Sequence, residues 1–262
     1  MKDKVVLISG GSSGIGLAIA EDLISRGSHV ISLSRSEEKI ERALKQKPQL
    51  KGKVDFVTGD ISNPEDAKRL YQHIADTYGV LHGLVNNAGV LTKGTMETVS
   101  VEDWQFTLDV NLTGPYILTK TLLPLMKKAS GASIVNISSV AGLKPGTSVA
   151  YSVSKAGLDM LTRFLAGDLG PYKIRVNSVN PGLVKTNIHL DNKIFEDTKN
   201  YEAMLDKARP RYPIGRIGEP EDIANMVRFL LSEESSWVTG SIITADGGVT
   251  VENDLIPPKE GQ

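Results

Sequence analysis

Two side chains capable of proton chemistry stand four positions apart in the segment YSVSK, which runs from Tyr151 to Lys155. On an α-helix, residues i and i+4 share one face, so the phenol and the ammonium can converge on one bound molecule. A phenol titrates at about pH 10 in water, so it needs a neighbouring positive charge to act as an acid or base at neutral pH. A half-buried tyrosine followed by a solvated lysine fits the same spacing, so the pair needs support from other motifs.

A glycine-rich turn follows the first apolar run, VVLIS, and leads into the helical pattern LAIAEDLISRG. The turn, GGSSGIG, spaces Gly10, Gly14 and Gly16 as G-x-x-x-G-x-G. Such a turn lets the backbone approach a pyrophosphate, and the start of the helix offers free N–H groups and a positive dipole end. We therefore predict that a dinucleotide binds here, with further contacts from Ser12, Ser13 and Ile15.

The end of the second apolar run bears on the choice of dinucleotide. Ser34 and Arg35 stand where a site selective for NAD usually has an acidic residue. Arg35 can make a charge-assisted contact to a 2′-phosphate, and Ser34 can donate a hydrogen bond beside it. We predict NADP(H), with NAD(H) possible; the alternative for Arg35 is a solvated loop cation. The third and fourth runs end at further expected cofactor contacts: Asp60, Ile61, Asn87, Ala88 and Gly89.

These motifs lie at the ends of short apolar runs that alternate with longer amphipathic segments. The pattern predicts an α/β fold with a doubly wound parallel sheet and helices on both faces. Helix starts are expected at Asn63-Pro64, at Ser100 and at Glu219-Pro220. The seven predicted strands cover residues 5–9, 29–34, 54–58, 83–87, 133–138, 175–180 and 241–245.

The domain organisation follows from the same alternation. No linker or repeat divides the chain, so we predict one domain over residues 1–262. Two segments break the rhythm: residues 183–216 are expected to form a substrate lid, and residues 252–262 are expected to form a loose tail.

The composition is that of an ordinary globular protein, with 262 residues, 40% hydrophobic content and a formal net charge of -1. A charge this close to zero, without a dense Lys/Arg block, does not suggest nucleic-acid binding. The chain has no cysteine and its histidines show no ligand spacing, so we predict neither disulfides nor a metal site. The first apolar run is too short for a signal peptide or a membrane span, so we expect a cytoplasmic protein.

In their order along the chain, the motifs resemble those of the short-chain dehydrogenase/reductase family over residues 4–248. The resemblance implies a Rossmann-type fold and a homotetramer or homodimer. It also implies an enzyme that transfers hydride between a nicotinamide cofactor and a carbonyl compound or secondary alcohol. The matching segments are SGGSSGIG, GDI, NNAG, VNLTG, NISSVAG, YSVSK, NPGLVKT and ITADGG.

The resemblance also implies roles for individual residues. Tyr151 would be the general acid/base, and Lys155 would bind the nicotinamide ribose and lower the pKa of Tyr151. Asn111 would orient a water that links Lys155 to solvent in a proton relay. The nicotinamide end of the cofactor would contact Pro181, Gly182, Val184 and Thr186.

A serine of the NISS run would hydrogen-bond the reacting oxygen, and two positions compete for this role. The local S-S-x-x-G pattern favours Ser139, whereas the separation from the tyrosine that is commoner in the family favours Ser138. We choose Ser139 because loop lengths vary more easily than strand ends.

The apolar residues of the expected lid have two alternative roles. Leu183, Ile188, Leu190 and Phe195 either line an apolar substrate pocket or pack the lid onto the domain. His189 is expected to be solvated, so we do not include it in the site. The sequence does not identify the substrate: an acyl-carrier ketone, a steroid and a sugar all suit it.

Two other functions compete with an NADP(H)-dependent oxidoreductase. One is an NAD-linked alcohol dehydrogenase that works mainly toward oxidation. The other is a non-catalytic dinucleotide sensor or scaffold that binds a protein partner, since a fold alone does not fix function. The chain keeps Asn111, a serine pair, Tyr151 and Lys155, which favours an enzyme.

Overall fold

A computed structural model describes residues 1–146 and 148–251. Its seven strands form one sheet in the order β3-β2-β1-β4-β5-β6-β7, and every neighbouring pair is parallel. This topology confirms the predicted doubly wound sheet, and each strand lies within one residue of its predicted ends. The strands are β1 (Val5–Ser9), β2 (His29–Ser34), β3 (Val54–Thr58), β4 (Gly83–Asn86), β5 (Ser133–Ile137), β6 (Arg175–Pro181) and β7 (Ile242–Ala245).

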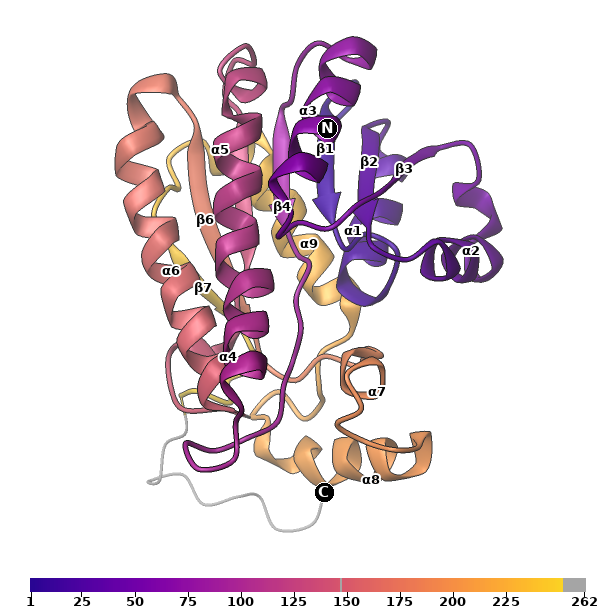
Figure 1. Cartoon of the computed structure of the whole chain (residues 1–262), viewed down its shortest axis with the longest axis vertical. Coiled ribbons are helices and arrows are strands. Elements are labelled where there is room, and N and C mark those ends of the chain that lie inside the picture. The colour runs from indigo at the N-terminus through magenta and orange to yellow at the C-terminus, as the bar shows by residue number, and fades with distance from the viewer. Residues whose placement is uncertain (147, 252–262) are drawn as a thin grey trace.

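Helices cover both faces of the sheet (Figure 1). Helices α3, α5 and α6 pack on one face, and α1, α2 and α9 pack on the other. The α-helices are α1 (Gly14–Ser25), α2 (Glu37–Gln46), α3 (Pro64–Thr77), α4 (Val101–Leu108), α5 (Gly114–Met126), α6 (Val149–Leu169), α7 (Ile188–Asp191), α8 (Thr198–Ala208) and α9 (Pro220–Leu231). No helix of the described residues combines the length and apolar character that crossing a membrane requires.

The strands are buried on both sides because successive side chains of a strand point to opposite faces. In β1, Val5 and Leu7 join the core beneath α3, α5 and α6. Val6 and Ile8 join the core beneath α1 and α9. The two cores hold the strands rigidly, so the loops at their carboxyl ends occupy fixed positions along one edge of the sheet.

The helix starts predicted from capping residues are confirmed. The Asn63 side chain accepts from Glu65 N at 2.9 Å at the start of α3. The Ser100 side chain accepts from Asp103 N at 3.0 Å at the start of α4. Glu219 precedes Pro220, the first residue of α9. Local capping chemistry therefore sets where these helices begin.

Helices α7 and α8 lie beyond the carboxyl ends of the strands rather than on a face of the sheet (Figure 1). Both belong to the segment 183–216, which we expected to form a lid. Its residues Tyr201, Leu205 and Tyr212 pack with Ile217 and Val249 in a small apolar cluster of their own. The predicted loose tail at residues 252–262 lies outside the described residues.

Candidate active site

A cavity of about 570 Å³ opens at the carboxyl ends of the central strands. Strand β1 pairs with β2 on one side and with β4 on the other, so the strand order reverses here. Open α/β sheets bind ligands at such a point, and the volume is in the range of ligand pockets. The predicted cofactor residues that line the cavity are Gly10, Ser12, Ser13, Gly14, Ile15, Ser34, Arg35, Ile61, Asn87, Ala88, Gly89, Tyr151, Lys155, Pro181, Gly182, Val184 and Thr186.

The glycine turn between β1 and α1 has the shape that a dinucleotide site requires. Gly10 has a φ of +69°, a backbone conformation that favours glycine. A Cβ atom on Gly16 would lie 2.3 Å from the Gly10 carbonyl oxygen, so only glycine fits beneath the turn. Gly16 itself lies beneath the turn and does not line the cavity. Because no side chain at Gly10 or Gly16 fills the turn, the start of α1 is open to a diphosphate, and the residues present fit a bound dinucleotide.

The turn is tied to the end of β4 by Ser9 and Asn87. The Ser9 hydroxyl accepts from Asn87 N and Ala88 N, both at 3.1 Å. The Asn87 amide donates to the carbonyl oxygens of Ser9 at 3.0 Å and Gly10 at 3.1 Å. The Ser9 hydroxyl and the Asn87 amide therefore fix the two loops against each other.

Arg35 directly follows β2 and lies at the end of the cavity beside that strand. Its Nη1 atom is 3.8 Å from Asp60 Oδ2, and its Cζ atom is 5.9 Å from the centre of the Phe106 ring. Asp60 does not line the cavity, although the sequence predicted it as a cofactor contact. Beside Arg35, the Ser12 and Ser34 hydroxyls share a 2.9 Å hydrogen bond. This end of the cavity offers a guanidinium and hydroxyls to a ligand.

Tyr151 and Lys155 lie on one face of α6, as their spacing predicts, and both line the cavity. Lys155 is buried, and its Nζ atom donates to the Ile137 carbonyl oxygen at 2.9 Å. Burial lowers the pKa of Lys155 to about 8, although the nearby Asp159 carboxylate acts in the opposite direction. Lys155 therefore stays mainly protonated at neutral pH but loses its proton at a lower pH than an exposed lysine does.

The pKa of Tyr151 differs from the expectation. Burial raises the pKa of the phenol, and a hydrogen bond with the Ser139 hydroxyl opposes this rise only in part. The Lys155 Nζ atom is 5.6 Å from the centre of the Tyr151 ring. In the chain alone, the cost of desolvating a phenolate dominates, so the pKa is not lowered.

The two competing serines have different partners. The Ser138 hydroxyl donates to the Lys155 carbonyl oxygen at 3.2 Å and is buried. The Ser139 hydroxyl accepts from Ala141 N at 3.1 Å and also hydrogen-bonds Tyr151. Ser139 is therefore the serine that lies beside the phenol.

Asn111 lies in a π-helical turn, Asp109–Thr113, between α4 and α5. Its amide is fully buried: the oxygen accepts from Val90 N at 2.8 Å, and the nitrogen donates to Val90 O at 3.0 Å and Ser154 Oγ at 3.1 Å. Asn111 does not line the cavity. A Cβ atom on Gly89 would lie 3.4 Å from the Asn111 amide oxygen and 3.7 Å from Lys155 Nζ. Because glycine has no Cβ atom, the Asn111 oxygen and the Lys155 ammonium both face the space beside Gly89.

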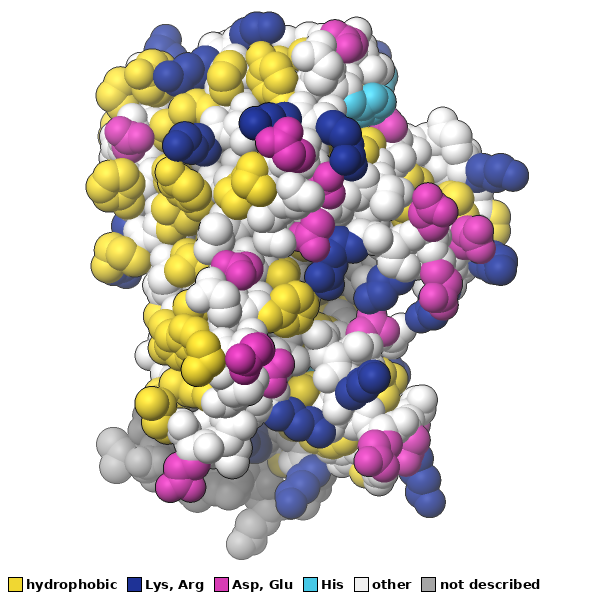
Figure 2. Space-filling model, viewed as in Figure 1, with side chains coloured by type: hydrophobic (Ala, Val, Ile, Leu, Met, Phe, Trp, Pro, Cys, Tyr) yellow, Lys and Arg dark blue, Asp and Glu magenta, His cyan; other side chains and the backbone are white. Residues whose placement is uncertain are grey.

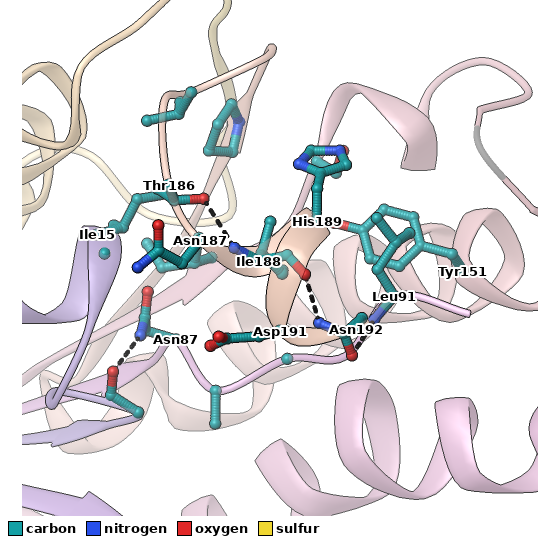
Figure 3. A pocket seen from close by; sticks show the side chains of 18 of the residues that line it. Ile15, Asn87, Leu91, Tyr151, Thr186, Asn187, Ile188, His189, Asp191 and Asn192 are labelled. Atoms are coloured by element: carbon teal, nitrogen blue, oxygen red, sulfur yellow. Dashed lines mark hydrogen bonds between the residues drawn. The ribbon is translucent and has the colours of Figure 1, made fainter. Parts of the chain in front are cut away.

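The apolar residues of segment 183–216 divide between the two alternatives that the sequence left open. Leu190 and Phe195 pack onto the apolar cluster around Tyr201, Ile188 lines the cavity, and Leu183 does both. His189 also lines the cavity, on the side of α7 where Tyr151 lies (Figure 3). Its ring stacks on Tyr201 at 5.6 Å, and burial lowers its pKa. The expectation of a solvated His189 is wrong, because the ring is part-buried against the aromatic rings of Phe195 and Tyr201 in the same segment.

Several further residues of the cavity were not predicted from the sequence. Lys39 lies on α2, and Asn187, Asp191 and Asn192 lie at or near α7. Their partners are far away along the chain: Lys39 pairs with Asp191, and Asn192 accepts from Leu91 N at 3.3 Å. No local spacing signals such contacts, so only the fold reveals them.

The fold and cavity agree with the relatives of this chain. The family model described as "Enoyl-(Acyl carrier protein) reductase" matches residues 10–250. An oxidoreductase of Thermotoga maritima is 41% identical over 249 residues, which is 94% of this chain and 97% of the relative. An NADP-dependent (R)-specific alcohol dehydrogenase of Lentilactobacillus kefiri is 34% identical over 258 residues, covering 96% of this chain and 98% of the relative.

A solved structure of similar fold also matches nearly the whole chain. The ligand-free aldohexose dehydrogenase of Thermoplasma acidophilum superposes with a TM-score of 0.87 at 34% identity, and the match covers 98% of each chain. The chain belongs to the short-chain dehydrogenase/reductase family and is an oxidoreductase.

Proposed function

We propose that this protein is an NADP(H)-dependent oxidoreductase that interconverts a carbonyl compound and a secondary alcohol, with Tyr151 as general acid/base. One observation carries the proposal: Tyr151, Ser139 and Lys155 line the same cavity as the glycine turn. A bound nicotinamide would supply or accept the hydride at the substrate carbon.

The side chains around Tyr151 suit proton transfer to a substrate oxygen. The raised pKa keeps the phenol protonated at neutral pH, so in reduction Tyr151 donates its proton to the developing alkoxide. Ser139 donates a hydrogen bond to the same oxygen, and the Lys155 ammonium stabilises the phenolate that remains. Asn111 orients the water that returns a proton toward Lys155, because Gly89 leaves space between the two side chains.

The preference for NADP(H) rests on the end of the cavity at β2. Arg35 lines it together with Ser34 and Ser36. Among the described residues, the acidic side chain in the cavity lining is Asp191, which comes from α7 rather than from the end of β2 and is paired with Lys39. A guanidinium with adjacent hydroxyls suits a 2′-phosphate, whereas a ribose hydroxyl is usually bound by a carboxylate. A relative that covers nearly the whole chain is named as NADP-dependent.

We propose that the chain is one domain in which segment 183–216 acts as the substrate lid. The lid side chains Ile188 and His189 line the cavity near Tyr151 (Figure 3). The remaining wall is apolar at Leu183 and Val249. The named relatives act on an alcohol and on an aldohexose, so similarity does not fix the substrate.

We also propose a homo-oligomer, a tetramer or dimer, built on α5 and α6. Exposed apolar side chains gather on the side of the molecule that these helices form (Figure 2). On α6, Val153, Met160 and Phe164 are 44%, 62% and 70% exposed, and Tyr116 on α5 is 47% exposed. Contiguous apolar surface of this kind marks protein interfaces. Phe164→Lys should therefore shift the mass measured by light scattering to a smaller species, while Met96→Lys, an exposed loop substitution, should not.

The direct test of the proposed function is cofactor consumption against a panel of ketones and aldehydes, with NADPH and NADH compared at saturation. We expect turnover with at least one carbonyl compound and a preference for NADPH. Tight binding of NADPH without turnover of any compound would instead favour the sensor or scaffold, and a preference for NADH would favour the NAD-linked dehydrogenase.

A further inference from the structure

An ion pair joins two walls of the cavity. Lys39 Nζ lies 2.6 Å from Asp191 Oδ2, although the two residues are 152 positions apart in the sequence. Lys39 lies in the first turn of α2, four residues after Arg35, and Asp191 is the last residue of α7 in the lid. The pair therefore links the lid to the wall where we propose that the 2′-phosphate binds.

Lys39 is placed to act together with Arg35. Its backbone N–H donates to the Ser36 hydroxyl at 3.2 Å, which fixes the start of α2 beside the cavity. Its side chain is 40% exposed, so it is free to change partner. Arg35 and Lys39 each face a carboxylate, at 3.8 Å for Asp60 and 2.6 Å for Asp191. A phosphate monoester carries more negative charge than a carboxylate and offers more acceptor oxygens.

Two contacts hold α7 in place, one through Asp191 and one through Asn192. The Asn192 amide oxygen accepts from Leu91 N at 3.3 Å. Asp191 extends from α7 toward the side where Asn87 lies, whereas His189 lies on the side of Tyr151 (Figure 3). Loss of the Lys39 contact would therefore free α7 at the cofactor side while Asn192 still holds it.

We propose that Lys39 is a second cation for the 2′-phosphate of NADP(H) and that Asp191 occupies Lys39 until the phosphate arrives. When the 2′-phosphate binds Lys39, the ion pair between Lys39 and Asp191 breaks, and α7 is no longer held on the cofactor side. The position of the lid then depends on the 2′-phosphate, the group that distinguishes NADP(H) from NAD(H). This inference rests on the proposed function for the choice of cofactor.

The test is fluorescence titration of NADPH and NADH into the wild-type protein, Lys39→Gln and Asp191→Asn. Lys39→Gln should weaken NADPH about tenfold and leave NADH within about twofold, because only NADPH carries the 2′-phosphate. Asp191→Asn should tighten NADPH by about threefold and leave NADH unchanged, because an exposed competing ion pair is worth little. The matched control is Arg42→Gln, which removes an exposed cation paired with Glu38 on the same helix and should change neither affinity.

Hydrogen exchange in the cofactor-free protein provides a second readout. The amides of Asn192 and Ile194 donate to carbonyl oxygens of Ile188 and His189 at the end of α7. Lys39→Gln and Asp191→Asn remove the same ion pair, so each should accelerate exchange at these amides by a similar factor. Unchanged exchange in both variants would contradict the tie between Lys39 and α7.

Three results would overturn the inference. If Lys39→Gln and Asp191→Asn weaken NADPH and NADH equally, the ion pair closes the lid over any dinucleotide and does not compete with the phosphate. If Arg35→Ala weakens NADPH but Lys39→Gln does not, Lys39 is no ligand of the phosphate, while the proposed cofactor preference stands. If neither substitution affects NADPH, the proposed 2′-phosphate site itself is wrong.

Discussion

Lys155 Nζ donates a 2.9 Å hydrogen bond to the carbonyl oxygen of Ile137, the last residue of β5. The ammonium is thereby fixed to the edge of the sheet, 5.6 Å from the centre of the Tyr151 ring. Because it is buried, it remains a strong local charge whose field water does not screen. The charge that would stabilise a Tyr151 phenolate is thus held in place by the backbone of the sheet.

The burial of Lys155 predicts a dependence of stability on pH. The folded-state pKa of Lys155 is about 8, whereas the ordinary value is 10.5, so the folded protein binds this proton less tightly than the unfolded chain. The resulting destabilisation is fully present below pH 8 and disappears as pH rises to 10.5. Urea unfolding should show that Lys155→Met gains stability relative to wild type below pH 8, by up to roughly 3 kcal/mol, and that this gain shrinks toward pH 10.5. A difference that is constant with pH would contradict a buried, charged Lys155.

The two serines should separate in kinetics. Ser139→Ala removes the hydroxyl beside Tyr151, so kcat should fall on the order of 100-fold, as for loss of a donor to a developing oxyanion. Ser138→Ala removes a buried hydrogen bond to the Lys155 backbone, so it should cost about 1 kcal/mol of stability and leave kcat within about tenfold. Steady-state rates and urea unfolding of both variants test this, and the reverse pattern would assign the role to Ser138.

Arg35 should distinguish the two cofactors. Arg35→Ala removes the guanidinium at the end of β2, so NADPH should bind more weakly by about tenfold or more, while NADH should lose little. The measurement is titration of both cofactors into wild type and variant. Equal losses for both cofactors would show that Arg35 does not bind the 2′-phosphate.

Gly16 offers a steric test of the dinucleotide turn. A Cβ atom there would meet the Gly10 carbonyl oxygen, so Gly16→Ala should weaken NADPH binding at least tenfold and cost about 1–3 kcal/mol of stability. Gly167→Ala is the matched control, because a Cβ atom on this exposed α6 glycine would meet nothing within 4 Å. That substitution should raise stability by roughly 0.5–1 kcal/mol and leave NADPH binding unchanged. Wild-type affinity in Gly16→Ala would argue against the turn as the cofactor site.

The sheet could be predicted from sequence because its signals are local. The alternation that places Val5 and Leu7 on one face and Val6 and Ile8 on the other is visible in five consecutive residues. The convergence of Tyr151 and Lys155 likewise follows from helical spacing alone.

The rest of the site depends on contacts between distant segments. Lys39 and Asp191 carry no motif, and their meeting requires the complete fold. The partial burial of His189 required Tyr201 and Phe195, which contact its ring from elsewhere in segment 183–216. The raised pKa of Tyr151 follows from desolvation of its phenol by the segments around it, which no local pattern encodes.

The most direct test of the account is the turnover of Tyr151→Phe on the best carbonyl substrate at saturating NADPH. Phenylalanine keeps the ring and removes only the proton donor, so kcat should fall by at least about 100-fold, while NADPH affinity and the urea midpoint stay near those of wild type. A variant that binds NADPH normally and keeps kcat within tenfold of wild type would contradict the assignment of Tyr151 as general acid/base.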